Sequence, residues 1–328
     1  MGDIKNLKHE LEQKIMEADK VIIVPHNSID FDAIGSAIGL SLIAKKYKKT
    51  PYIIVNDPVY KIDHGVQLII DDAKRYVSII NRDKYSQVHT ESNLFILTDV
   101  NKTHLICLND KMTSGNIVII DHHDEDQSTI SASYKYIDTY ASSSSEIVAK
   151  LLCAFKIKPN DDISNYLLSG IYLDTNKLTK NASPETMKTI AKLLESGANM
   201  NKVTELFAED FISDRRVQEL VSKAKITTFS VATVCADDNY EYTREELAKV
   251  ADYLLKYKVD AAFAIGGIGD DTISISARSK ERVNVGAVMQ NLEGGGNQYS
   301  AATKLTNCTI EEAHEKLIKI IQPPCYIK

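Results

Sequence analysis

Aspartate and histidine side chains recur where short apolar runs of the sequence end. One such residue alone is typical of a helix cap or a loop, and Asp32 in isolation reads as an N-cap. Four run ends of this kind in one chain are hard to explain as turns. The apolar runs are Val21–Val24, Leu94–Thr98, Ile117–Ile120 and Ile171–Leu173. The polar residues that follow them are His26, Asp30, Asp32, Asp99, Asp121, His122, His123 and Asp174.

Side chains of these types are ligands for divalent cations. Asp30 and Asp32 stand two residues apart, so an extended backbone points both the same way. Two carboxylates that close repel each other unless a cation lies between them. A ligand set of four of these aspartates and two of these histidines suits Mn²⁺ or a similar ion better than a metal that prefers thiolates. The set is too large for one octahedral ion with open positions. It fits two ions bridged by shared carboxylates, which activate a water and stabilise both oxygens of a phosphoryl transfer.

The elements that carry these residues alternate along the first half of the chain. Helix-like sequence such as Asp32–Tyr47 separates short apolar runs that read as buried strands. This alternation predicts an α/β domain with a doubly wound, mainly parallel sheet. Because the carboxyl ends of parallel strands share one edge, where ligands bind, the candidate residues are expected to meet there. The predicted strands are Val21–Val24, Tyr52–Val55, Leu94–Thr98 and Ile117–Ile120.

The character of the sequence changes twice further along. Helical sequence dominates from Ser144 to about Leu206, and the polar, charged stretch 207–225 is interpreted as a connector. The first domain is therefore predicted over residues 1–206, and a second, smaller α/β domain over residues 226–328. Its expected elements are the strands Thr228–Cys235, Asp260–Ile265 and Thr272–Arg278 and the helix Thr243–Lys256.

Two features of the second domain could bind an anion. Alternation along Thr272–Arg278 puts Ser274, Ser276 and Arg278 on one face of the strand. Arg278 can then hold a phosphate with its two-pronged guanidinium, although a solvated surface arginine is the alternative. The run Gly294–Gly296 allows a close backbone approach and offers amide donors, although surface turns use such triplets too.

Composition limits the partners and the compartment. The chain has 328 residues, which suggests two domains, and a formal net charge of −6, which argues against a protein that coats duplex DNA. No apolar run approaches the roughly 20 residues that cross a bilayer, and no signal-peptide pattern opens the sequence. The five cysteines are scattered without a CxxC pair, which is typical of reduced thiols. A cytoplasmic protein is expected, with no membrane segment in this chain.

The motifs resemble the DHH phosphoesterases in type and order. The four family motifs are matched by His-x-x-x-Asp-x-Asp at His26, Asp30 and Asp32, by Asp99, by Asp121-His122-His123 and by Asp174. The second domain resembles the DHH-associated domain through Ser276-Ala277-Arg278-Ser279 and Gly294-Gly295-Gly296. Four segments are more similar to the GdpP-type cyclic-di-AMP phosphodiesterases of that family, namely Asp30–Gly35, Tyr140–Glu146, Leu173–Lys177 and Ser300–Thr303.

The resemblance implies a role for each residue. One Mn²⁺ would be held by His26, Asp30, Asp99 and Asp174, and the other by Asp32, Asp99, His122 and Asp174, with Co²⁺ or Mg²⁺ as substitutes. His123 would face the scissile phosphate and Asp121 would orient the histidines, so that His123, Asp121 and Asp99 form the expected catalytic set. The implied substrate-binding residues are His123, Arg278, Ser279, Gly294, Gly295, Gly296 and Asn297, the last at a position where the family has histidine.

The implied function is hydrolysis of cyclic di-AMP, or of another cyclic dinucleotide, to a linear dinucleotide such as pApA, in a cleft between the domains. One alternative is a nanoRNase/pAp phosphatase for short oligoribonucleotides. In the first motif, that branch of the family usually has glycine at the position of Phe31. In the fourth motif, it usually has Gly-Arg-Phe at the position of Asn176-Lys177-Leu178. A catalytically weakened nucleotide-binding module, suggested by Asn297, is another alternative. Since GdpP-type relatives carry a membrane anchor, the chain is expected to be a stand-alone cytoplasmic enzyme or the cytoplasmic part of a longer protein. Relatives often dimerise, so a homodimer is considered.

Overall fold

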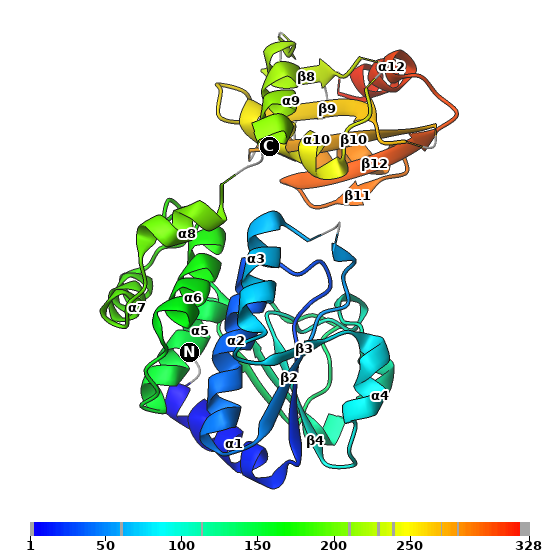
Figure 1. The fold of residues 1–328 in the computed structure, drawn as a ribbon. Coiled ribbons are helices and arrows are strands. Elements are labelled where there is room, and N and C mark those ends of the chain that lie inside the picture. The colour runs from blue at the N-terminus through cyan, green and yellow to red at the C-terminus, as the bar shows by residue number, and fades with distance from the viewer. Residues whose placement is uncertain are drawn as a thin grey trace. The chain divides into compact units, whose positions relative to one another are not determined.

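The chain forms two compact units, residues 1–208 and residues 209–328, which are described separately (Figure 1). The structure is a computed structural model. No helix in the part of the chain that it describes is long and apolar enough to span a membrane. The described residues are 3–59, 62–112, 114–208, 211–227, 230–237, 240–269, 271–280 and 282–321.

The first unit is built on a six-stranded sheet in which every neighbouring pair is parallel. The strand order β3-β2-β1-β4-β5-β6 confirms the predicted doubly wound sheet. The direction of strand addition reverses between β1 and β4, and such a switch point is where open α/β sheets bind ligands. The strands are β1 (Lys20–Val24), β2 (Thr50–Ile54), β3 (Ser78–Ile80), β4 (Asn93–Thr98), β5 (Ile117–Asp121) and β6 (Tyr134–Ile137).

Helices cover both faces of this sheet, which is why its strands are continuous apolar runs. Residues 21–24 of β1 are fully buried, and successive side chains enter different apolar cores on the two faces. The larger core lies under α1, α2, α5 and α6, and the smaller one lies on the side of α4 (Figure 1). The helices are α1 (Ile4–Glu17), α2 (Phe31–Lys46), α3 (His64–Ala73), α4 (Tyr85–Val88), α5 (Ser144–Ala154), α6 (Asp161–Asp174), α7 (Pro184–Glu195) and α8 (Met200–Leu206).

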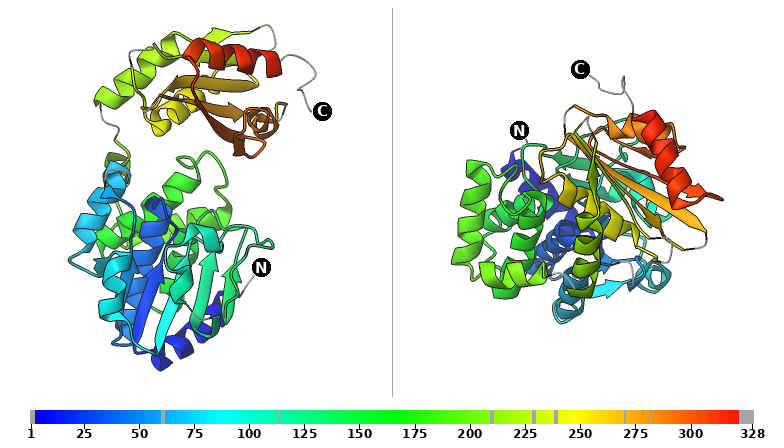
Figure 2. Two further views of the ribbon diagram at one scale, coloured as in Figure 1. Left: turned by 90° about the vertical axis from the view of Figure 1, so that its right-hand side faces the viewer. Right: turned by 90° about the horizontal axis from the view of Figure 1, so that it is seen from above.

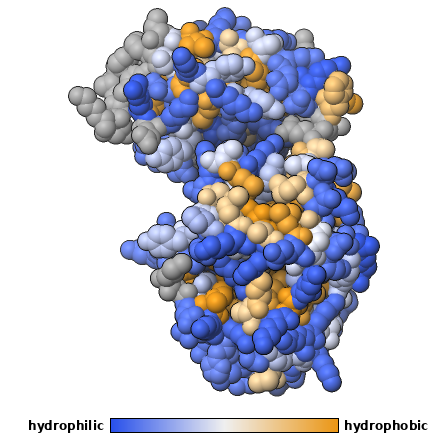
Figure 3. All heavy atoms as spheres, turned by 90° about the vertical axis from the view of Figure 1, so that its left-hand side faces the viewer, coloured by the Kyte–Doolittle hydropathy of each residue, from blue (hydrophilic) through white to orange (hydrophobic). Residues whose placement is uncertain are grey.

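Helices α2 and α6 pack closely because each has a glycine at the contact. A Cβ on Gly35 of α2 would lie 2.5 Å from the carbonyl oxygen of Tyr166 in α6, and Gly170 of α6 faces α2 in the same way. Helix α7 begins at a capping box between Ser183 and Thr186. Figure 3 views the side of the molecule that carries α7 and α8, where apolar patches of the first unit lie among hydrophilic side chains.

The second unit is also an α/β structure, with a mixed sheet in the order β11-β12-β10-β9-β8-β7. Only β8 and β9 are parallel, and the other neighbours are antiparallel. Helices α10 and α12 lie on opposite sides of the sheet (Figure 2), and both contact β9. Its elements are α9 (Phe211–Ser222), β7 (Lys225–Ile226), β8 (Val231–Cys235), α10 (Arg244–Leu254), β9 (Ala261–Gly267), β10 (Thr272–Ser279), α11 (Val285–Gln290), β11 (Gly295–Gly296), β12 (Ser300–Thr306) and α12 (Ile310–Ile320).

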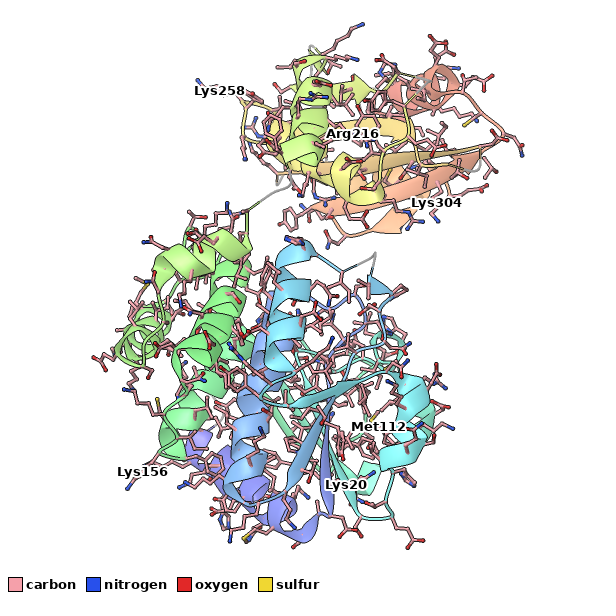
Figure 4. All side chains as sticks on the ribbon, viewed as in Figure 1. Lys20, Met112, Lys156, Arg216, Lys258 and Lys304 are labelled. Carbon is pink, nitrogen blue, oxygen red and sulfur yellow. The ribbon has the colours of Figure 1, made fainter. Side chains whose placement is uncertain are left out.

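The interpretation of residues 207–225 as a connector is wrong. Helix α9 occupies most of this stretch and belongs to the second unit. Val217 and Leu220 are fully buried in the core of that unit, and Val221 packs against it. Most other residues of the helix are polar or charged, so the composition of the segment does not reveal this narrow apolar stripe. Arg216, labelled in Figure 4, extends from α9 over the ring of Tyr242, and its Nε lies 3.5 Å from a carboxylate oxygen of Glu246 in α10.

Some sequence predictions fall partly outside the described residues. The predicted strand Thr228–Cys235 begins at Val231 in the structure, and residues 228–229 are outside the described part, as are residues 322–328 of the predicted second domain. Cys107, Cys153, Cys235 and Cys308 are free thiols, as expected, and Cys325 lies outside the described residues.

Candidate metal centre

Eight carboxylate and imidazole side chains converge at the carboxyl edge of the parallel sheet. Their ligand atoms form overlapping groups, and within each group all lie within 4.8 Å of one another. His26 follows β1 and Asp99 follows β4, so the site lies at the switch point of the sheet. The groups are His26-Asp30-Asp99, Asp32-His122-Asp174 and Asp99-Asp121-His122-His123.

Asp99 lies between the two histidines of the cluster. Its Oδ2 is 3.3 Å from Nε2 of His26, and its Oδ1 is 3.4 Å from Nε2 of His122. The side chain is almost fully buried, and its backbone has a φ of 59°, a strained conformation that is common at functional sites. One carboxylate that faces two imidazoles through different oxygens has the arrangement of a bridging ligand.

The loop after β1 is fixed by a residue that sequence analysis did not select. Both carboxylate oxygens of Asp57 accept backbone N–H groups, from Ser28 at 2.8 Å and from Ile29 at 3.0 Å. Within the loop, Nδ1 of His26 lies 2.7 Å from the carbonyl oxygen of Asn27, which leaves Nε2 for a ligand. Asp57 follows β2 as Asp99 follows β4, so the pattern that identified the other aspartates also applied here.

The two aspartates of the first motif occupy different backbone environments. Asp30 is the N-cap of α2 and accepts the N–H groups of Asp32 and Ala33, whereas Asp32 lies in the first helical turn. The expectation that an extended backbone points both side chains the same way is therefore wrong, because the helix begins between them. Asp30 and Asp32 still reach adjoining parts of the cluster, His26 and His122 respectively.

Asp32 is fully buried, and the start of α5 holds it in place. Its two oxygens accept the N–H groups of Ser144 and Ser145, each at 2.7 Å, where the positive end of a helix stabilises a carboxylate. The fully buried Glu146 accepts the N–H of Ser142 at 2.9 Å and so fixes the loop that leads into α5.

His122 provides the clearest evidence that the cluster fits a metal ion. Its Nε2 lies 3.3 Å from Asp174, 3.4 Å from Asp99 and 4.0 Å from Asp32. This nitrogen is buried and has no hydrogen-bond partner among the described residues. A buried, unpaired imidazole nitrogen within reach of three carboxylates is the donor set of a divalent cation.

Asp121 orients the backbone of one histidine and the side chain of the next. Its Oδ1 accepts the N–H groups of His122 and His123 and lies 2.9 Å from Nδ1 of His123. The side chain of His123 is 57% exposed, whereas Asp121 is fully buried. His123 thus lies at the open side of the cluster, with Nε2 left to face a ligand.

Asp174 ends a helix, although it follows an apolar run like those of the strands. It is the last residue of α6, and the four residues that follow include three with positive φ: Asn176, Lys177 and Leu178. The structure groups Asp174 with Asp32 and His122 but not with His26 and Asp30. Its predicted place as a ligand of both ions therefore stays a prediction.

The charges of the cluster shift the pKa values of its members strongly. Burial alone would lower the pKa of His26 and His122, but neighbouring carboxylates outweigh it. Asp30, followed by Asp99, raises the pKa of His26 to about 11. Asp99, foremost among its neighbours, raises the pKa of His122 to about 10. Burial and the negative charge of Asp99 raise the pKa of Asp174 to about 7, and burial likewise raises that of Asp32. Burial alone would also raise the pKa of Asp99, but the nearby imidazoles of His122 and His26 lower it.

Binding of a divalent metal is therefore expected to release more than one proton per chain at neutral pH. His26 and His122 are protonated below their raised pKa values and must lose a proton to coordinate, so affinity should increase as the pH rises. Titration calorimetry in buffers of different ionisation enthalpy measures this release. A His26→Gln variant should release fewer protons, and heats that do not depend on the buffer would contradict the prediction.

The residues expected to bind substrate from the second unit have partners within that unit. Arg278 has a 3.0 Å contact from Nε to the carboxylate of Asp252, and the Ser279 hydroxyl donates to the carbonyl of Gln298. The Asn297 side chain accepts the N–H groups of Tyr299 and Ser300 and so closes the turn between β11 and β12.

The glycine run is explained by this hairpin. Gly295 and Gly296 form β11, and a Cβ on Gly294 or Gly296 would lie 2.4 Å from backbone atoms of β12. The two faces of β10 do not differ in solvent exposure. Ser274 and Ser276 on one face are as buried as the apolar residues Ile275 and Ala277 on the other. The contact of these residues with substrate, and the predicted cleft between the domains, stay predictions.

A pocket of about 800 Å³ in the first unit opens onto the cluster. Its volume is that of a site for a small organic ligand. Its lining is polar apart from two alanines and one large ring, that of Tyr140, a residue that sequence analysis did not select among the 16 tyrosines. The lining residues are His122, His123, Asp124, Thr139, Tyr140, Ala141, Ser142, Asp174, Asn181, Ala182 and Ser183.

The chain is similar in sequence to known protein families and to curated proteins. Residues 20–173 match the model of the DHH family, N-terminal domain, and residues 226–323 match that of the DHHA1 domain. The cyclic-di-AMP phosphodiesterase GdpP of Geobacillus thermodenitrificans is 31% identical over 96% of this chain and 49% of its own length. The cyclic-di-AMP phosphodiesterase PdeA of Listeria monocytogenes is 29% identical over the same shares. The chain thus spans about half the length of these relatives.

A solved structure shares the fold. An exopolyphosphatase-related protein from Bacteroides fragilis superimposes with a TM-score of 0.81, covering 96% of this chain and 95% of that one, at 19% identity. At this identity the likeness concerns the fold alone.

Proposed function

Because the chain belongs to the DHH family and carries its DHHA1 domain, we propose that it is a metal-dependent phosphodiesterase that hydrolyses cyclic di-AMP to a linear dinucleotide such as pApA. The main structural support for two-metal hydrolysis is Asp99, whose two carboxylate oxygens face His26 and His122 separately. The similarity to two cyclic-di-AMP phosphodiesterases over 96% of the chain supports the choice of substrate.

The cluster would hold two divalent ions, with His26, Asp30 and Asp99 on one side and Asp32, Asp99, His122 and Asp174 on the other. Mn²⁺ is the proposed ion because imidazole and carboxylate ligands are mixed, and Co²⁺ or Mg²⁺ are the proposed substitutes. When bound, such a pair makes a water nucleophile more acidic and neutralises charge on the phosphate.

Residues around the cluster would set the protonation of His123 and the position of Asp32. The hydrogen bond with Asp121 raises the pKa of His123, which favours a protonated imidazole that donates from Nε2 to a phosphate oxygen. The α5 amides hold Asp32 through both oxygens and so keep its charge directed at the cluster. In the second unit, a phosphate that binds the Nε of Arg278 would have to replace the carboxylate of Asp252.

The test is turnover by the purified chain. Chelation should abolish hydrolysis of cyclic di-AMP and added Mn²⁺ should restore it, with pApA as the product on chromatography. A panel of cyclic di-AMP, short oligoribonucleotides, pAp and inorganic tripolyphosphate separates the candidates. Cleavage of oligoribonucleotides or pAp without cleavage of cyclic di-AMP would contradict the substrate, and nucleotide binding without any product would indicate a binding module. The cytoplasmic location and the homodimer stay predictions.

A further inference from the structure

Tyr140 is not among the predicted metal ligands, and two observations draw attention to it. Its side chain is 79% exposed, and no large apolar side chain in the described part of the chain is more exposed. It also lines the pocket that contains His122, His123 and Asp174. A single exposed ring needs no explanation by itself, but this one lines the same pocket as the charged cluster.

The sheet topology explains why the ring is there. Strand β6 runs parallel to β5 and pairs Ile137 with Asp121, so residues that follow β6 lie beside His122 and His123. The N–H of Asp138 donates to the carbonyl of Asp121 at 3.0 Å, which continues this register past the end of the strand. Tyr140 thus belongs to the same carboxyl edge as the metal ligands.

The backbone of Tyr140 lies in an ordered turn. Its own N–H donates to the carboxylate of the buried Asp138 at 3.2 Å, and the next N–H, of Ala141, donates to the Asp138 carbonyl at 3.0 Å. The N–H of Ser142 then donates to the buried Glu146. Because the backbone is fixed on both sides, the point from which the ring projects is fixed at the edge of the pocket.

The pocket therefore offers two chemically different surfaces. One consists of the carboxylates and imidazoles of the cluster, which bind phosphate only through cations. The other is the ring of Tyr140, a flat apolar surface that a phosphate does not use but on which a nucleobase stacks. A nucleotide matches both surfaces, because it has a phosphate near a flat aromatic base, whereas an inorganic polyphosphate matches only the first.

We propose that the ring of Tyr140 is the stacking surface for a nucleobase of the substrate whose phosphate lies at the cluster. The inference rests on the proposed function and specifies its substrate class as phosphodiesters that carry a base. Stacking on an aromatic ring tolerates any base, so Tyr140 contributes to affinity for nucleotides and leaves the choice among bases to polar contacts.

Kinetics of three variants test this role. Tyr140→Ala should raise KM for cyclic di-AMP by on the order of tenfold with little change in kcat, since each stacked base contributes that much to binding. Tyr140→Phe keeps the ring and should behave like the wild type. Tyr257→Ala, which removes an exposed tyrosine of the second unit, is the matched control. An unchanged KM in Tyr140→Ala, or an equal loss in Tyr140→Phe, would overturn the proposal.

A fluorescence measurement tests the contact without turnover. The chain contains no tryptophan, so Tyr140→Trp introduces a single indole, and Tyr257→Trp is its control. With Mg²⁺ present, pApA or AMP should quench the indole at position 140, and inorganic tripolyphosphate should not; equal responses to both would overturn the proposal. If the wild type hydrolyses no nucleotide, the proposed function fails, while quenching by AMP still supports stacking at Tyr140 and its absence refutes it.

Discussion

Replacing Asp99 with asparagine is expected to lower kcat/KM for cyclic di-AMP by on the order of a thousandfold or more. Asparagine has nearly the same shape and tolerates the positive φ of this position, so the variant should fold. It removes the charge whose two oxygens lie 3.3 Å and 3.4 Å from His26 and His122. Both halves of the cluster lose a ligand at once, which turnover assays and metal analysis of the purified protein would measure.

The same variant has a second expected effect that does not depend on activity. In the metal-free protein, the Asp99 carboxylate helps to raise the pKa of both histidines. Without that charge, His26 and His122 should titrate closer to the usual value of about 6.5, which NMR titration of the imidazole signals detects. Asp71→Asn is the matched control, because Asp71 is an exposed residue of α3 paired with Lys74. Near-normal turnover by Asp99→Asn, or unshifted histidines, would contradict a shared bridging ligand.

The convergence of the predicted metal ligands could be foreseen because parallel strands place their carboxyl ends at one edge of the sheet. Residues after β1, β4 and β5 must share one edge once the strands are known to be parallel, and His26, Asp99 and His122 confirm this. Asp174 was predicted as a ligand, but its element was not, since the three-residue run Ile171–Leu173 has no periodicity that separates a strand from the last turn of a helix. A helix end brings Asp174 to the cluster from the side of α6.

Contacts between distant segments could not be predicted. Asp32 is held by the N–H groups of Ser144 and Ser145, more than a hundred residues away, and nothing in either segment identifies the other. The serine run itself was a usable signal, because serine is a preferred N-cap and a helix start offers free N–H groups. Ser143 is indeed the N-cap of α5.

The second unit shows the limits of reading strand faces from the sequence. Period-two alternation in β10 predicted that Ser274, Ser276 and Arg278 share one face of the strand, but it could not predict that both serines are buried. Helix α10 packs on β10 and β9, and α12 packs on β9 and β8, so the sheet has helices on both faces. The Asn297 side chain closes a turn through two N–H groups, which explains asparagine here without reference to a ligand.

Gly170→Ala is expected to weaken both metal binding and stability, although alanine is the better helix former. A Cβ at this position of α6 would lie 2.4 Å from the Ser145 hydroxyl, 2.6 Å from a carboxylate oxygen of Asp32 and 2.8 Å from its Cα. The gain of about 1 kcal/mol in helix propensity is outweighed by overpacking of about 1–3 kcal/mol, since these atoms are buried and hydrogen-bonded. Denaturant unfolding of the metal-free chain measures the balance.

The Gly170→Ala variant also tests the site, because the added methyl group is expected to move Asp32. Relief of the clash pushes Asp32 away from α6, and with it the carboxylate oxygens that the α5 amides hold toward His122. Metal affinity should fall by about 10- to 100-fold, as for other changes that move a ligand without removing it, and calorimetry would report it. Gly115→Ala is the matched control, because a Cβ there meets no described atom within 4 Å and its φ is not left-handed. Should Gly170→Ala bind metal as the wild type does while Asp99→Asn does not, the exact position of Asp32 would be unimportant and the cluster would depend on Asp99 alone.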